Sequence, residues 1–272
     1  MTDQPAGTGV ESVLLERDGA IATLTLNRPA ALNALDLSMM DALVAHVASV
    51  ADDSTVRVVV LQGAGKHFMA GGDLKTFAAR LDGDPRERQR DFQQIVDRLH
   101  AAIEHVQRMP QPVICALRGA VAGFGLSLAA ASDLAVAADD AYFASAYRQI
   151  GLTPDGGGTW ALPRIVGLRK ALELLLLSER IDAAEALRLG LVNRVVAPEA
   201  LDAAVATLAE KLSTGPRMAL ANAKRLARDS LDRTLSEQLR AEAQSFAQCA
   251  ATPDFVEGIR AFLEKRPARF GG

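Results

Sequence analysis

Four short apolar runs most constrain how this chain can fold. Runs of this length are typical of strands buried on both faces of a parallel sheet, and they lie at 56–61, 113–117, 134–138 and 192–196. A helical stretch that Asp36 can cap runs to about Val50, before the first of these runs, and further helical stretches follow between them. This alternation of strands and helices predicts an α/β fold.

The two ends of the chain differ in pattern. Near the start, residues 13–27 predict a β-hairpin, because Asp18-Gly19 separates two strand-like runs. From residue 199 onward the sequence predicts only helices. We therefore expect a core domain at 1–198 and a helical C-terminal region at 199–272. The apolar faces of these helices are compatible with a lid on the core or with a subunit interface.

Bulk composition narrows the class of protein. The chain has 272 residues, 49% of them hydrophobic, and a net charge of −3 with no basic tract, which argues against nucleic acid as a partner. Residues 1–10 lack the regions of a signal peptide, and the apolar run at 119–131 is too short to span a membrane. Cys115 and Cys249 are predicted to be free thiols in a reducing cytoplasm. His100 and His105 are five residues apart, which does not fit a helical metal motif.

One turn combines an acid with residues that shape the backbone. Its sequence is Pro154-Asp155-Gly156-Gly157-Gly158. The proline fixes its own φ, and the glycines allow the backbone to approach another group closely. Asp155 then has two interpretations. It caps the apolar helix that follows, as aspartate often does, or it is a catalytic carboxylate.

Three segments, in this order and spacing, resemble the enoyl-CoA hydratase/isomerase (crotonase) superfamily. They are residues 68–74 (Phe-Met-Ala-Gly-Gly-Asp-Leu), 112–125 (Pro-Val-Ile-Cys-Ala-Leu-Arg-Gly-Ala-Val-Ala-Gly-Phe-Gly) and 151–159 (Gly-Leu-Thr-Pro-Asp-Gly-Gly-Gly-Thr). The resemblance implies a spiral of ββα turns with two roughly perpendicular sheets and a helical C-terminal trimerisation region. It also implies acyl-CoA thioester substrates, no metal or redox cofactor, and a homotrimer or a dimer of trimers.

The resemblance also assigns roles to individual residues. The backbone N–H groups of Ala70 and Phe124 would stabilise the oxyanion of a thioester enolate. CoA would run along the turn that contains Gly71, Gly72 and Asp73, and the acyl group would enter beside the Gly123 turn, between Phe124 and Tyr147. Lys265 has two interpretations: it is solvated at the surface, as is usual for such a residue, or it contacts a CoA phosphate of its own or a neighbouring subunit. These residues are the expected binding site.

The chain departs from the hydratases of this superfamily at two positions. Their two catalytic glutamates correspond to Ser127 and Tyr147 here, so both carboxylates that water addition needs are absent. Both side chains are expected in the pocket wall. Gly125-Leu126-Ser127-Leu128-Ala129 lacks the last glycine of a serine-hydrolase elbow.

Asp155 remains as the one acid at a family catalytic position. Its surroundings resemble those in the ring-opening isomerases of phenylacetate catabolism, which favours an acyl-CoA isomerase. The alternatives are a hydrolase or dehalogenase in which Asp155 is the nucleophile, and a non-catalytic acyl-CoA binder.

Overall fold

The computed structural model describes residues 11–271; residue 272 and residues 1–10, where the sequence predicts no signal peptide, lie outside it. The larger sheet has six strands in the order β1-β2-β3-β4-β6-β9. The β1–β2 pair is the predicted antiparallel hairpin, and the other neighbours are parallel. The strands are β1 (Val13–Asp18), β2 (Ile21–Leu26), β3 (Val58–Gly63), β4 (Val113–Leu117), β6 (Leu134–Ala138) and β9 (Arg194–Val196). All four apolar runs therefore contribute strands to this sheet.

A second sheet has three short strands. They are β5 (Ala120–Ala122), β7 (Tyr142–Ala144) and β8 (Ile181–Asp182), in the order β5-β7-β8. An isolated bridge pairs Met69 with Val121 of β5, and another pairs Leu35 with Gly72. These bridges bring the 68–74 turn against the small sheet. The α/β architecture with two sheets and C-terminal helices agrees with the prediction.

Helices follow most of the strands, and aspartates cap several of them. The α-helices before the C-terminal region are α1 (Leu37–Ala51), α2 (Leu74–Ala78), α3 (Pro85–Arg108), α4 (Phe124–Ala131), α5 (Gly158–Val166), α6 (Leu168–Leu177) and α7 (Ala183–Arg188). Short 3-10 turns are η1 (Pro29–Ala31), η2 (Arg148–Ile150), η3 (Pro198–Ala200) and η4 (Ser230–Asp232). Asp36 caps α1 through the Met39 N–H and Asp182 caps α7, as the sequence predicts.

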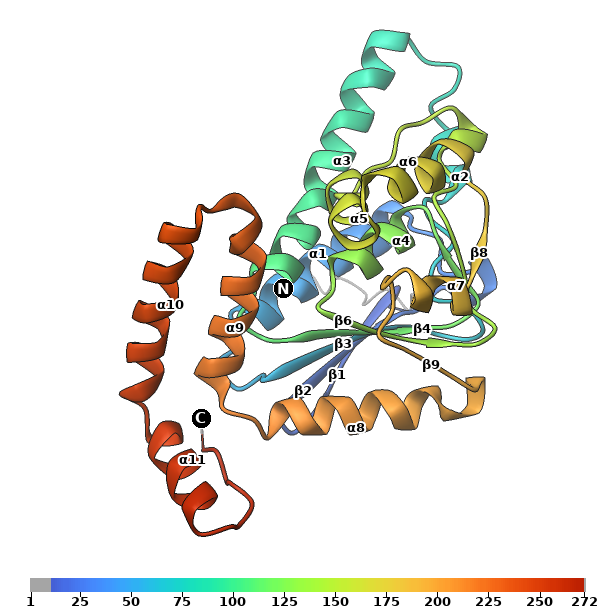
Figure 1. Ribbon diagram of the computed structural model, residues 1–272. Helices are drawn as coiled ribbons and strands as arrows, with labels where there is room; N and C mark the ends of the chain where they lie inside the picture. The colour runs from blue at the N-terminus through green and yellow to red at the C-terminus, as the bar shows by residue number, and fades with distance from the viewer. Residues whose placement is uncertain (1–10, 272) are drawn as a thin grey trace, which may run out of the picture.

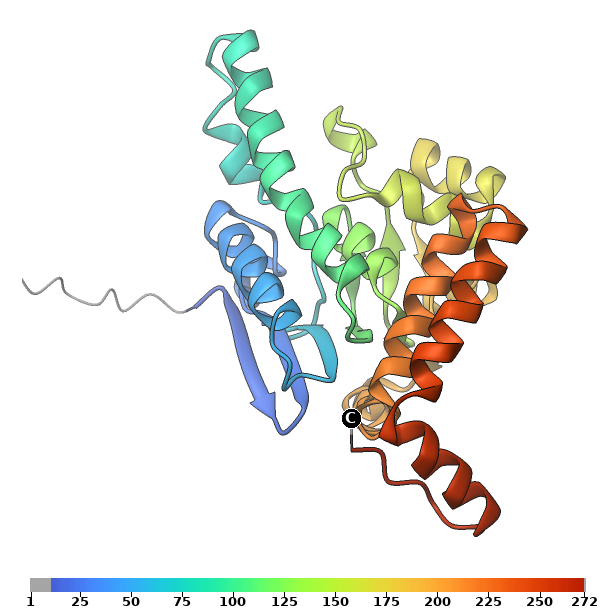
Figure 2. The same cartoon turned by 90° about the vertical axis from the view of Figure 1, so that its left-hand side faces the viewer.

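The C-terminal helices divide into two groups. They are α8 (Leu201–Ser213), α9 (Arg217–Asp229), α10 (Leu235–Ala250) and α11 (Pro253–Leu263). The apolar face of α8 packs on the large sheet opposite α1 and α3, with Leu201, Val205 and Ala209 buried (Figure 1). In contrast, α10 runs beside α9, and α11 extends beyond the end of α10, away from the core (Figure 2). Their large apolar side chains are exposed: Leu235, Leu239, Phe246, Phe255, Val256, Ile259, Phe262 and Leu263.

Two features are absent from residues 11–271. Within that range, no helix has the length and apolar character needed to cross a membrane. The same residues contain no group of three or more histidine, cysteine, aspartate or glutamate side chains arranged to hold a metal ion. Cys115 is buried and free, as predicted, and Cys249 is also free.

Candidate active site

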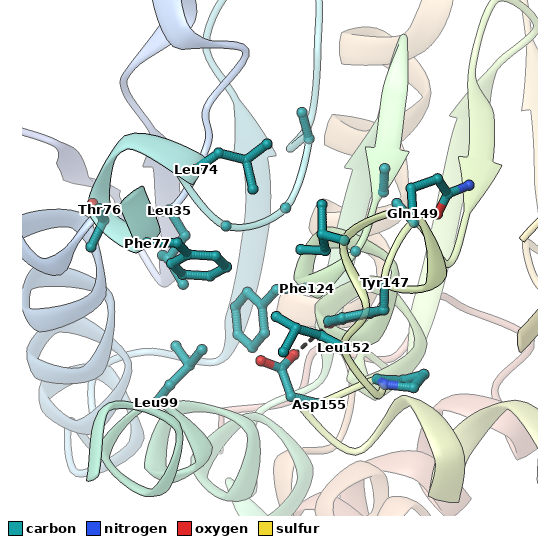
Figure 3. Close-up of a pocket in the computed structure, with 18 of the residues that line it drawn as sticks. Leu35, Leu74, Thr76, Phe77, Leu99, Phe124, Tyr147, Gln149, Leu152 and Asp155 are labelled. Carbon is teal, nitrogen blue, oxygen red and sulfur yellow. Dashed lines mark hydrogen bonds between the residues drawn. The ribbon is translucent and has the colours of Figure 1, made fainter. Parts of the chain in front are cut away.

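A cavity of about 650 Å³ lies between helices α1–α3 and the small sheet. The Pro154–Asp155 segment and the residues around η2 close its third side (Figure 3). Its wall on the side of α1–α3 is mainly apolar, with contributions from Leu35, Met40, Leu74, Phe77, Phe92, Ile95 and Leu99; the polar residues on this side are Asp36, Thr76 and His100. The cavity has the size and apolar lining that are typical of small-molecule sites.

Two glycines bring the backbone segments of the cavity together. Gly71 has φ +98° and Gly123 has φ +55°, and residues other than glycine rarely adopt backbone conformations with such positive φ values. A Cβ atom on Gly123 would lie only 3.1 Å from the Cα atom of Gly71. The 68–74 turn can therefore approach the start of α4 only because both positions lack a side chain.

The prediction that the Ala70 N–H is an oxyanion donor is contradicted by the structure. The Ala70 N–H already donates a hydrogen bond to the Leu32 carbonyl at 3.1 Å, so it is not free to bind a substrate oxygen. The expectation from the sequence was wrong because this pairing joins segments that are far apart in the chain.

The backbone N–H of Gly72, unlike that of Ala70, is available to a substrate oxygen. Leu35 pairs with the residues on either side of it: the Leu35 N–H donates to the Gly71 carbonyl, and the Asp73 N–H donates to the Leu35 carbonyl. In a parallel pairing, the intervening residue directs its own N–H to the opposite edge. Gly72 also lines the cavity, so its N–H is the donor that this turn can offer.

The backbone of Phe124 is placed so that the role predicted from the sequence stays open to it. It is the first residue of α4 and follows Gly123, so its N–H has no acceptor within the helix. The positive end of the helix dipole adds to the attraction for an oxyanion. The Phe124 side chain is only 2% exposed, and its ring packs against the Gly156 backbone.

Asp155 does not cap the helix that follows it. The helix α5 begins at Gly158, and its N-cap residue is Gly157, which makes no side-chain capping bond. The Asp155 Oδ1 atom instead accepts a hydrogen bond of 2.5 Å from the Tyr147 hydroxyl. Figure 3 shows this bond and places the other carboxylate oxygen on the side of Phe124 and Leu99, which also line the cavity. The capping interpretation is therefore wrong.

The Asp155 carboxyl group holds its proton more strongly in this site than it would in water. Burial raises the pKa of Asp155, and the hydrogen bond from Tyr147 offsets only part of this rise. Burial also raises the pKa of Tyr147, so the phenol keeps its proton and remains a donor. A carboxyl group with a raised pKa is closer to what an acid–base catalyst needs near neutral pH.

Two carboxylates lie among the described residues that line the cavity, and Asp155 is the one that neither caps a helix nor pairs with a cation. The second carboxylate is that of Asp36, which accepts from the Met39 N–H at 2.8 Å and pairs with Arg28 at 3.1 Å. Asp73, which the sequence placed in the binding site, lies outside the cavity lining. It caps α2 and pairs with Arg28 at 2.9 Å.

Ser127 and His100 contact the backbone next to the Asp155 carboxyl group. Ser127 is 3% exposed, and its hydroxyl donates to the Asp155 carbonyl at 2.8 Å, so it lies behind the turn rather than in the cavity wall. The Gly156 N–H donates to His100 Nε2 at 3.2 Å. The spacing of His100 and His105 bears only on metal binding, and no local motif in the sequence signals this contact.

Lys265 is not brought to the cavity of its own chain. It follows α11, among the exposed apolar side chains of the C-terminal region, and is absent from the cavity lining. A contact between Lys265 and a CoA phosphate remains a prediction and requires a neighbouring subunit.

Comparison with known proteins identifies the family of this chain. The sequence model of the enoyl-CoA hydratase/isomerase family matches residues 16–272. The chain belongs to this family. It is 36% identical over 264 residues to 1,2-epoxyphenylacetyl-CoA isomerase of Escherichia coli, with coverage of 97% of this chain and 99% of the relative.

Hydratases of the family are as similar to this chain as the isomerase is. Crotonyl-CoA hydratase of Syntrophomonas wolfei is 36% identical over 261 residues, covering 96% of this chain and 98% of the relative. The crystal structure of an enoyl-CoA hydratase from Polaromonas sp. JS666 superposes with a TM-score of 0.88 at 36% identity, covering 95% of this chain and 99% of the other. Overall similarity therefore establishes the family, and the choice of reaction depends on the residues of the site.

Proposed function

We propose that this protein is an acyl-CoA isomerase that moves a double bond or opens a ring through one acid–base residue, Asp155. One observation carries the proposal: among the described residues of a mainly apolar cavity, Asp155 is the single carboxylate that neither caps a helix nor pairs with a cation, and Tyr147 fixes its orientation. Hydration needs one group to activate water and another to protonate carbon. Isomerisation needs only one group, because the same carboxyl can take a proton and return it.

The proposed reaction has two steps. The Asp155 carboxylate removes a proton from the α-carbon of the thioester, and the electron pair moves onto the carbonyl oxygen. The N–H groups of Gly72 and Phe124 stabilise this oxyanion; the loss of one such donor costs about 3–4 kcal/mol in other enzymes. The carboxyl group then returns the proton at the γ-carbon, which shifts the double bond. The chemistry uses protein groups and the thioester, and CoA enters as part of the substrate.

The acyl group is proposed to lie between Phe124 and Tyr147, with pantetheine along the 70–75 turn. Both aromatic residues line the cavity, and so do Ala70, Gly71 and Gly72 of that turn. Similarity to an epoxyphenylacetyl-CoA isomerase supports the inclusion of aryl and epoxide thioesters among the candidates.

We also propose that the protein assembles as a trimer or a dimer of trimers. The support is the group of exposed apolar side chains on α10 and α11, which a monomer would leave in water. Obligate interfaces are large and apolar. Light scattering at micromolar concentration should give at least the mass of a trimer, and a monomer would refute this part of the proposal.

The function is tested with a panel of 3-enoyl-, 2-enoyl-, aryl- and epoxide-CoA thioesters. Proton NMR in D₂O should show deuterium entering the α and γ carbons of the accepted substrate, with a new double-bond position or an opened ring in the product. A covalent aspartyl adduct in mass spectrometry would instead indicate a nucleophilic Asp155. Tight binding without turnover of any thioester would indicate a binding protein.

A further inference from the structure

We propose that His100 and Ser127 are positioning residues that hold the Asp155–Gly156 peptide from its two ends. The Ser127 hydroxyl donates to the carbonyl oxygen of this peptide at 2.8 Å, and the N–H of the same peptide donates to His100 Nε2 at 3.2 Å. The inference rests on the proposed role of Asp155 as the base. It assigns a task to two side chains that the reaction itself does not use.

The turn needs such support because of its glycines. Gly156 and Gly157 have φ values of +58° and +73°, and the Gly158 N–H closes the turn on the Asp155 carbonyl at 3.1 Å. Glycine allows this conformation, but it restrains rotation of the adjoining peptide less than other residues do. The direction of the Asp155 side chain depends on the orientation of this peptide.

The contacts come from three separate elements. His100 lies on α3, Ser127 lies within α4, and the Tyr147 hydroxyl that bonds the carboxyl group comes from the segment just before η2. Together they fix the carbonyl, the N–H and one carboxylate oxygen around Asp155. The second carboxylate oxygen is left to face the cavity (Figure 3).

Each side chain has the chemistry that its contact requires. The Gly156 N–H can only donate, so His100 Nε2 is the acceptor and offers its lone pair to this contact. Ser127 is small enough to lie under the turn: a Cβ atom on Gly156 would be 2.9 Å from its Cβ, and one on Gly158 would be 2.7 Å from its Oγ. A glutamate at 127 would have to displace the turn. The serine therefore supports Asp155 where hydratases place a second acid.

The test compares His100→Leu and Ser127→Ala with His100→Gln, whose amide oxygen can accept the Gly156 N–H. His105→Leu, on the same helix but outside the cavity lining, is the matched control. With 3-hexenoyl-CoA, or another thioester that the panel identifies, His100→Leu and Ser127→Ala should each lower kcat about 10-fold or more and leave KM within about twofold. Misplacement of a catalytic group by about 1 Å can cost on the order of 100-fold. His100→Gln should recover most of kcat.

A second readout does not depend on turnover. Amide hydrogen exchange of Gly156 in the ligand-free protein should be faster in His100→Leu than in the parent or in His105→Leu. Unchanged exchange, or a His100→Gln variant as slow as His100→Leu, would overturn the proposal. If instead Asp155→Asn keeps full turnover while Gly156 exchange responds as expected, the base assignment fails and the peptide contacts stand.

Discussion

Asp73 and Asp155 occupy similar sequences but opposite environments. Each lies beside consecutive glycines in a turn next to a short helix. Asp73 caps α2 and pairs with Arg28, whereas Asp155 caps nothing and bonds a buried tyrosine. Burial acts to raise the pKa of both. In Asp73 the hydrogen bonds from Arg28 and the Lys75 N–H outweigh burial and lower the pKa; in Asp155 burial prevails.

This comparison shows how one residue type serves structure in one turn and chemistry in the other. A carboxylate with a cationic partner is stable as the anion and is a weak base. A carboxylate in an apolar cavity with only a neutral phenol donor is a stronger base, but its charge is costly to bury. We therefore expect paired substitutions at the two positions to separate catalysis from stability.

The largest expected effect is on turnover. Asp155→Asn should lower kcat by about 10²–10⁴-fold, because positioned acid–base groups typically contribute that much and the amide cannot accept the proton. Asp73→Asn removes the same charge from the other turn and should leave kcat within a few-fold. Steady-state kinetics on the accepted thioester measure both. Asp155→Asn with near-parental turnover would remove the proposed mechanism.

The next effect concerns binding through the Asp73 turn. In Gly72→Val, the new Cβ would lie 2.7 Å from the Phe77 ring, and the displaced turn should weaken acyl-CoA affinity by about 10-fold or more. Gly83→Ala, where the nearest atom to the new Cβ is the Arg80 carbonyl oxygen at 3.6 Å, is the control. Calorimetric titration with an acyl-CoA gives both affinities. Equal affinities would contradict the placement of CoA along this turn.

A smaller effect is expected on the free energy of unfolding, and it should differ between the two positions. Asp73→Asn should lower the free energy of unfolding by about 1–2 kcal/mol, because Arg28 loses a charged partner while keeping Asp36. Asp155→Asn should leave it unchanged or raise it at neutral pH, because a buried charge is removed. Urea denaturation at pH 7 distinguishes the two. Marked destabilisation by Asp155→Asn would mean that Asp155 is a structural residue.

The smallest effect is the pH dependence of these stability differences. The folded-state pKa of Asp73 lies below its ordinary value of 3.8, so its stabilisation is present above pH 3.8 and is lost as pH falls through the folded value. The folded-state pKa of Asp155 lies above 3.8, so its contribution is most favourable below pH 3.8 and is lost as pH rises through the folded value. Denaturation of the two Asn variants against the parent, as a function of pH, should give slopes of opposite sign.

The sequence by itself determined the main strands and several caps. The apolar runs became β3, β4, β6 and β9 because a parallel sheet buries both faces of its strands. Asp36 and Asp182 cap helices as predicted because capping is a local interaction. The strands β5 and β8 were missed because two or three residues are too short to show a period.

Only the tertiary structure decided which groups face the cavity. Pairing with Leu32 engages the Ala70 N–H, pairing with Leu35 turns the Gly72 N–H the other way, and α3 brings His100 to Gly156. The presence of Asp155 in a glycine turn could be read from the sequence. Its bond to Tyr147 could not, because the partner of a hydrogen bond depends on neighbours that only the folded chain brings together.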